Sequence, residues 1–151
     1  MSFINNVLKV FVGDKSKKDV KALQPLIDQI NAFEKEMENL SHDALREKTH
    51  AFKKLLQEAT ANIQSEIESL KLEALNETDI DKNEDIYNKI DQLKEAQYSI
   101  TEKVLHDILP EAFAVVKETA KRFTQSEEIA VKASASDRKA AATKDYVNIQ
   151  E

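Results

Sequence analysis

The stretch EALNETDIDKNED, residues 73–85, divides two long series of regularly spaced apolar residues. Its middle part, residues 76–80, has no helical stripe and is rich in turn-forming side chains, which predicts a loop. Asp81 is predicted to cap the helix that follows, with Glu84 reaching back as its capping-box partner. A short polar loop between two helical stretches indicates a helical hairpin.

Apolar residues recur at spacings of three and four on both sides of this loop, which is typical of a coiled-coil seam. Before the loop, the series consists of Leu45, Phe52, Leu56, Ala59, Ile63, Ile67, Leu70 and Ala74. After the loop, it consists of Ile86, Ile90, Leu93, Gln97, Ile100, Val104 and Ile108. Each arm has one apolar stripe to bury, so residues 42–108 are predicted to pair as a long antiparallel hairpin. The alternative is a compact bundle in which the preceding helix also lies alongside.

The position of the loop sets the register of the two arms. With the loop centre near residue 78, Ile63 is expected to lie opposite Leu93, and Ala59 opposite Gln97. Gln97 is then a polar residue inside the seam, and its amide is expected to turn toward water beside the small side chain of Ala59.

After the hairpin, residues 109–124 are predicted to form a separate helix. Pro110 lacks a backbone donor and fits the first turn of a helix. Glu118 stands four residues before Arg122, which is the spacing of a helical ion pair. One apolar stripe is expected to pack on a neighbour, and it consists of Phe113, Val116, Ala120 and Phe123.

Before the hairpin, residues 16–40 are predicted to form a helix that is kinked at Pro25, because proline removes one helical hydrogen bond. Ser41 is the predicted N-cap of the next helix. The apolar stripe of this kinked helix consists of Val20, Leu23, Ile27, Ile30, Phe33 and Met37.

Residues 1–13 are predicted to form a short amphipathic helix that Gly13 ends. Residues 1–18 contain four lysines and one aspartate, which gives a net charge of +3. A basic amphipathic helix can bind an anionic membrane surface. The residues expected to contact such a surface are Ile4, Val7, Leu8, Lys9 and Phe11. The alternative is that this apolar stripe packs on the chain's own domain.

Residues 125–151 show no sustained helical period. Ile129 and Val131 stand in alternation, which weakly indicates a strand, and Tyr146 begins a second alternating run. Residues 139–142 are long enough for one helical turn. Because a strand without a partner is not stable, this tail is predicted to be extended or disordered.

The composition favours long helices and argues against several classes of function. The 151 residues include one glycine, two prolines and 33% charged residues, which suits an all-α fold. The net charge of −6 argues against nucleic-acid binding, and the lack of cysteine excludes disulfides and thiolate metal sites. A phosphate-binding loop needs several glycines, so neither an ATP site nor a catalytic residue is expected. Glu102 and His106 share a helix face, but no third ligand is evident, so no metal site is expected.

Three stretches of the chain carry a family resemblance. They are VLKVFVGD at residues 7–14, INAFEKEMENLSHDALREKT at residues 30–49 and LPEAFAVVKE at residues 109–118. In this order they resemble the segments that precede the nucleotide-binding core of SecA, the motor ATPase of preprotein translocation. The chain departs from the common pattern of that family between Leu56 and Asp107, where a long charged insertion appears, and it does not contain the family's catalytic motifs.

The resemblance implies the N-terminal region of a SecA-type translocase subunit. Members of that family use ATP and Mg to move preproteins through the SecY channel, and they work in the cytoplasm and peripherally on the inner face of the membrane. The resemblance also implies contact of the N-terminal helix with acidic phospholipids, and it leaves a homodimer open. The fragment itself is expected to bind no cofactor and to have a structural or contact role. The alternatives are a free-standing coiled-coil interaction or adaptor module and, less favoured, a small helical enzyme.

Overall fold

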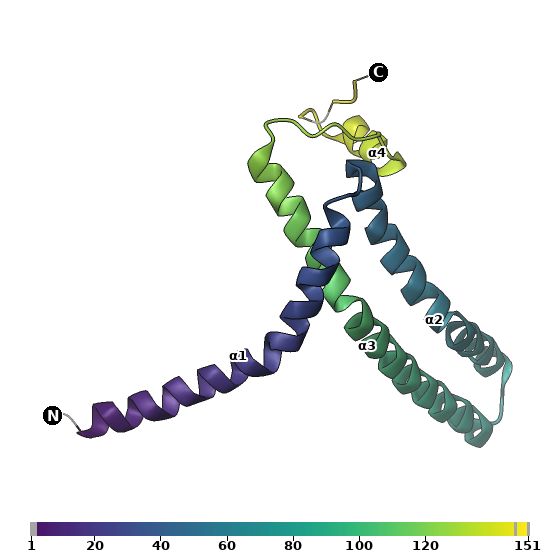
Figure 1. Cartoon of the computed structure of the whole chain (residues 1–151). Helices are drawn as coiled ribbons and strands as arrows, with labels where there is room; N and C mark the ends of the chain where they lie inside the picture. The colour runs from purple at the N-terminus through teal and green to yellow at the C-terminus, as the bar shows by residue number, and fades with distance from the viewer. Residues whose placement is uncertain (1–2, 147, 151) are drawn as a thin grey trace.

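The computed structural model describes the backbone of residues 3–146 and 148–150, and the side chains of these residues from Asp19 onward. Within that part of the chain all regular structure is helical, which confirms the predicted all-α class. The four helices are α1 (Phe3–Met37), α2 (His42–Asn76), α3 (Ile80–Gln125) and α4 (Ala135–Thr143). Figure 1 shows α2 and α3 side by side, while α1 crosses α3 and leads away from it.

The seam between α2 and α3 holds the first of two apolar clusters. Its buried members are Ile67, Leu70, Ala74, Ile86 and Ile90. Ile63 of α2 and Leu93 of α3 both pack against this cluster, so both lie in the seam, and their direct pairing stays a prediction. Each arm thus buries a stripe that it could not bury alone.

The turn between the arms differs from its prediction by two residues. Asp79, not Asp81, is the N-cap of α3, and its carboxylate accepts hydrogen bonds from the backbone N–H groups of Asp81 and Lys82 at 3.1 and 3.4 Å. Glu77 accepts two more backbone hydrogen bonds within the turn. The predicted capping box of Asp81 and Glu84 is therefore wrong. Asp79 already accepts hydrogen bonds from the first free N–H groups of the helix.

Two positions in the seam also differ from the prediction. Ala59 is exposed, and Thr60 takes its place at the seam, where its hydroxyl donates to the carbonyl of Leu56 at 2.9 Å. The threonine can sit there because this bond satisfies its polar atom. The half-buried Gln97 donates through its amide to the exposed Gln64, at its Oε1, across the hairpin at 2.9 Å.

The chain does not break before Pro110. The prediction of a separate helix over residues 109–124 is wrong, because α3 continues to Gln125 with Pro110 buried inside it. A proline in a helix interior costs about 3 kcal/mol. The burial of Ala114 and Val115 in the second apolar cluster, just beyond Pro110, offsets this cost. The buried members of that cluster are Met37, Leu45, Ala114 and Val115.

The predicted apolar stripe on this part of α3 is not the buried one. Phe113, Val116 and Phe123 are all exposed. The side chains turned toward the neighbouring helices are instead Ala114, Val115 and Glu118. A residue as small as Ala114, which is fully buried, allows two helices to approach α3 closely, and the larger apolar side chains then lie outside.

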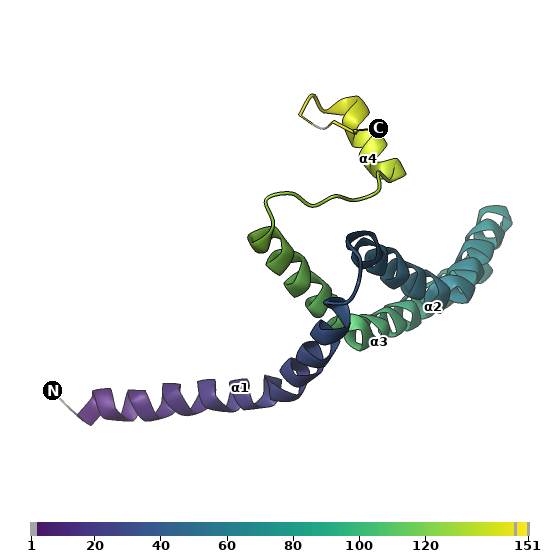
Figure 2. The same ribbon diagram turned by 45° about the horizontal axis from the view of Figure 1, so that its top comes forward.

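The first helix is longer than predicted. α1 runs without interruption from Phe3 to Met37, so the prediction that Gly13 ends a short first helix is wrong. A glycine inside a helix costs only about 1 kcal/mol, and the lysines after it are good helix formers. Pro25 lies inside α1, and Figures 1 and 2 both show the helix bent where its colour passes from purple to blue. Ser41 caps α2 as predicted, accepting from the backbone of Ala44 at 3.1 Å.

The tail contains a helix longer than the single turn that residues 139–142 allowed. Residues 127–134 are irregular, but α4 follows them, so the expectation of a wholly extended or disordered tail is wrong. The Ser134 hydroxyl accepts from the backbone of Asp137 at 3.2 Å, and the Asp137 carboxylate accepts from the backbone of Ser134 at 2.8 Å. This capping box satisfies the first turn of α4, and the alanines that follow favour the helix.

Candidate interaction site

Arg122 lies where the end of α1, the start of α2 and the last turns of α3 meet. Its guanidinium donates to the backbone carbonyls of Met37 and Leu40 at 3.0 and 2.9 Å. It also donates to His42 Nδ1 at 3.1 Å, since arginine has no acceptor, and to Glu118 Oε1 at 2.7 Å. One side chain therefore holds the loop between α1 and α2 against α3.

Glu118 is a charged residue that the fold buries, with only 4% of its surface exposed. A carboxylate so far from water is tolerated only when it is paired and hydrogen-bonded. Arg122, one turn further along α3, supplies that pair. The second carboxylate oxygen of Glu118 has no hydrogen bond, although Lys121 Nζ lies 3.8 Å away. The negative charge of Glu118 is thus compensated mainly by Arg122.

Two further ion pairs, one from α1 and one from the residue that follows it, reach α3 nearer the surface. Lys117 Nζ lies 2.6 Å from Glu34 Oε2, and Lys121 pairs with Glu38. The hydrogen bond between Lys121 and Glu38 lowers the pKa of the carboxyl group and raises the pKa of the amine. Because solvent screens such pairs, each contributes less to stability than the Arg122 pair.

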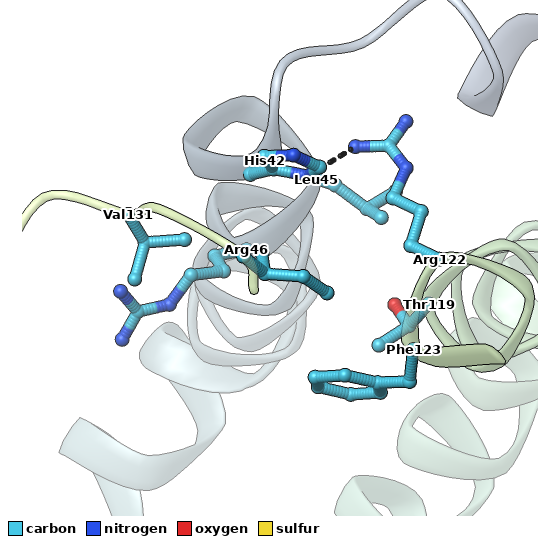
Figure 3. Close-up of a pocket in the computed structure, with 8 residues that line it drawn as sticks. His42, Leu45, Arg46, Thr119, Arg122, Phe123 and Val131 are labelled. Carbon is cyan, nitrogen blue, oxygen red and sulfur yellow. Dashed lines mark hydrogen bonds between the residues drawn. The ribbon is translucent and has the colours of Figure 1, made fainter. Parts of the chain in front are cut away.

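An apolar cavity of about 190 Å³ opens beside Arg122. Its lining comes from α2, from α3 and from the segment after α3, and consists of His42, Leu45, Arg46, Thr119, Arg122, Phe123, Ile129 and Val131. Figure 3 shows Phe123 on the α3 side and Val131 on the side of the following segment. Most of this lining is apolar, and two of its residues, Arg46 and Arg122, are cationic. Such a cavity is suited to holding an apolar side chain rather than to catalysis.

The segment after α3 is attached to the start of α2. The backbone N–H of Lys132 donates to Asp43 Oδ1 at 2.8 Å, and Arg46 donates to the carbonyl of Lys132 at 3.2 Å. Arg46 also pairs with Asp137 of α4 at 2.8 Å. The pKa of Asp137 is lowered to about 2, chiefly by the hydrogen bond from Arg46 and then by those from Ser134.

We predict that acid loosens this attachment. Folding lowers the pKa of Asp137 from 3.8 to about 2, so its contribution to stability is complete above about pH 4 and is lost as the pH falls toward 2. An NMR titration of the Ser134 amide, which donates to the Asp137 carboxylate, is expected to show a midpoint near the lowered pKa, which Asp137→Asn abolishes. A midpoint at the ordinary aspartate value would show that Arg46 does not hold this carboxylate.

Comparison with known proteins places the sequence of this chain in a family. Residues 8–136 match the SecA DEAD-like domain. The chain is 56% identical over 149 residues to the protein translocase subunit SecA of Flavobacterium psychrophilum, and 54% identical over 151 residues to that of Christiangramia forsetii. It is 37% identical over 146 residues to the SecA subunit of Bacteroides fragilis. The chain belongs to the SecA family.

This SecA-family chain spans 13 to 14% of the length of these three relatives, whereas the alignments cover 97 to 100% of the chain itself. They therefore run through residues 56–107. The charged stretch that departs from the common SecA pattern thus has a counterpart in these relatives. No solved structure matches the chain.

The membrane-contact residues predicted from the sequence are not tested by the structure. Ile4, Val7, Leu8, Lys9 and Phe11 lie in α1, but their side chains are outside the described residues. Over the part of this SecA-family chain that the structure describes, no helix is long and apolar enough to cross a membrane. In that same part, no three His, Cys, Asp or Glu side chains gather as metal ligands would.

Sequence reasoning found one contact of this junction and missed the rest. The spacing of four residues predicted the ion pair of Glu118 and Arg122, which is confirmed at 2.7 Å. The partners of Arg122 at Met37, Leu40 and His42 lie 80 to 85 residues away along the chain. Two of them are backbone carbonyls, which any residue supplies, so the sequence carries no signal for them.

Proposed function

We propose that this chain forms the N-terminal region of a SecA-type translocase, in which an ATP-driven motor moves preproteins through the SecY channel. The observation that carries the proposal is the 56% identity over 149 residues to a protein translocase subunit SecA. The adaptor-module alternative rests on the α2–α3 hairpin alone and is less favoured, because the alignment includes that hairpin together with the rest of the chain.

A chimera tests this proposal. The chain replaces the 149 matching residues of the Flavobacterium psychrophilum SecA, and the purified chimera is assayed for ATP hydrolysis and for preprotein transport into vesicles. Both activities are expected to persist. A chimera that folds and hydrolyses ATP but moves no preprotein would contradict the proposal.

Within such a motor, the region contributes surfaces rather than chemistry. The exposed stripe of Phe113, Val116 and Phe123 leaves apolar side chains of α3 in water, which is unfavourable for an isolated chain. We propose that this stripe packs against the nucleotide-binding core, which binds ATP and Mg in the whole translocase. The chain spans only 13 to 14% of the length of these relatives. The rest of a whole translocase is therefore available to cover the stripe, which supports the proposal.

We predict that the chain on its own gains no stability from Mg-ATP. Its sequence has a single glycine and therefore no phosphate-binding loop. A ligand present at 100 times its Kd would stabilise the fold by about 2.7 kcal/mol. Thermal unfolding with and without Mg-ATP should therefore coincide, and an increase in Tm that grows with the concentration of Mg-ATP would show that the prediction is wrong.

We further propose that the first helix contacts an acidic phospholipid surface and places the translocase peripherally on the cytoplasmic face of the membrane. The residues assigned to this contact are Ile4, Val7, Leu8, Lys9 and Phe11. The net charge of +3 over residues 1–18 supports the proposal, as does the course of α1, which leads away from the other helices in Figures 1 and 2. A homodimer remains a prediction.

Deleting residues 1–18 is expected to abolish binding to anionic vesicles. Each lysine near such a surface is worth about 1 kcal/mol at low salt, and salt weakens the attraction. Flotation with anionic vesicles measures the binding, and neutral vesicles are the control. If the deleted chain floats as well as the whole chain with anionic vesicles, the contact lies elsewhere.

A further inference from the structure

The tip of the α2–α3 hairpin exposes large apolar side chains on both sides of its turn. Leu75, near the end of α2, is 78% exposed, and Ile80, the first residue of α3, is 82% exposed. Leu72 and Tyr87 are exposed one turn or two further back along the arms. Contact of these apolar side chains with water is unfavourable in free energy, and a binding partner that covered them would remove this contact.

The same tip carries most of the net charge of the chain. From Leu72 to Tyr87 there are six carboxylates and one lysine, which gives −5, while the whole chain has a net charge of −6. Among the described residues, a lysine pairs with only one of these carboxylates: Lys82 lies 3.9 Å from Asp79. The apolar residues at the tip are therefore surrounded by negative charge that is largely uncompensated.

The turn that presents these residues is held rigidly by its own hydrogen bonds. The side-chain amide of Asn83 donates to the carbonyl of Ala74 at 3.1 Å and so ties the first turns of α3 to the end of α2. The carboxylates of Glu77 and Asp79 accept four backbone hydrogen bonds inside the turn. A surface that is already ordered loses little conformational entropy when it binds.

We propose that this tip is a docking site for a basic amphipathic helix of a partner protein. Such a helix offers an apolar stripe to Leu75 and Ile80, and cations beside the stripe to the surrounding carboxylates. An anionic bilayer offers apolar chains but would repel a charge of −5. Figures 1 and 2 show the turn at the far end of the hairpin from α4, where none of the other described helices covers it. The proposal does not depend on the membrane contact of α1 or on ATP-driven transport.

A synthetic peptide tests the proposal with the whole chain. The probe is an 18-residue helix with leucine along one face and lysine elsewhere, and the control peptide has the same charge with glutamine in place of leucine. Fluorescence anisotropy at low and high salt measures the Kd. The leucine peptide is expected to bind more tightly than the glutamine peptide, with an affinity that falls as salt screens the carboxylates.

Matched variants locate the binding surface. Leu75→Ser with Ile80→Ser removes the apolar tip, whereas Leu55→Ser with Tyr98→Ser removes two exposed apolar residues from the shaft of the hairpin. All four side chains are exposed, so both double variants should keep the fold. The tip variant is expected to weaken peptide binding by about tenfold, since a few side chains that become buried at the centre of a contact carry most of its binding energy, and the shaft variant to leave it unchanged.

A charge variant completes the test. Asp81→Asn, Glu84→Gln and Asp85→Asn together should weaken binding and reduce its dependence on salt. Equal binding of both peptides, or equal loss in the tip and shaft variants, would overturn the proposal. Self-association of the chain that the tip variant abolishes would also overturn it, because a second copy would then be the occupant of the tip.

Discussion

Arg122→Met is expected to lower the free energy of unfolding by about 3–5 kcal/mol, which is the usual cost of breaking a buried ion pair. The variant leaves the Glu118 carboxylate, 4% exposed, without its partner. It also takes the donor away from the carbonyls of Met37 and Leu40. Because the arginine side chain is only 12% exposed, solvent does little to reduce this cost.

Lys121→Met is the matched control for this variant. Lys121 precedes Arg122 on the same helix. Its pair with Glu38 lies nearer the surface, and its approach to Glu118 is long, at 3.8 Å, so its loss is expected to destabilise the fold clearly less than the loss of Arg122. Urea unfolding followed by circular dichroism measures both variants. Adding Glu118→Gln to Arg122→Met should restore part of the loss, because the unpaired charge is then removed. Equal destabilisation by Lys121→Met and Arg122→Met would show that the junction does not depend on this buried pair.

The seam of the hairpin is readable from the sequence because its physical cause is local. Ile63 and Ile67 recur at the helical spacing along α2, as Ile86 and Ile90 do along α3, and a stripe of this kind must be buried against another. The short loop then leaves an antiparallel neighbour as the partner. Ala59 and Thr60 each offer little apolar surface, one methyl group in each side chain, so the spacing alone does not decide which of them enters the seam.

The errors arise where tertiary packing overrides a local rule. Pro110 indicates a helix start, but burial of Ala114 and Val115 against two other helices favours continuation. The apolar stripe of Phe113 and Phe123 indicates a buried face, yet both residues are exposed. The sequence gives the period of a helix but not how many neighbours it has, and a helix with two neighbours on one side buries different residues.

Ile90→Asp is expected to lower the free energy of unfolding by at least about 4 kcal/mol. Ile90 is 1% exposed and lies at the centre of the seam cluster with Ile67 and Ile86. The change removes a buried apolar side chain, worth about 1.5–3 kcal/mol, and adds a charge with no cation to pair with it inside the seam. Such a loss is a large part of the 5–15 kcal/mol that typically stabilises a domain.

The two clusters predict how this variant fails. Ile90 belongs to the cluster between α2 and α3, whereas Met37 and Leu45 belong to the other cluster, at the junction with α1. Hydrogen exchange should therefore show lost protection over residues 60–95 and retained protection near Met37, because the outer hairpin opens before the junction does.

Ile80→Asp is the control for Ile90→Asp. This residue is exposed at the N-terminus of α3, where a negative charge is favourable, so its effect on the free energy of unfolding should stay within about 0.5 kcal/mol. Uniform loss of protection in Ile90→Asp would show instead that the hairpin and the junction unfold as one unit.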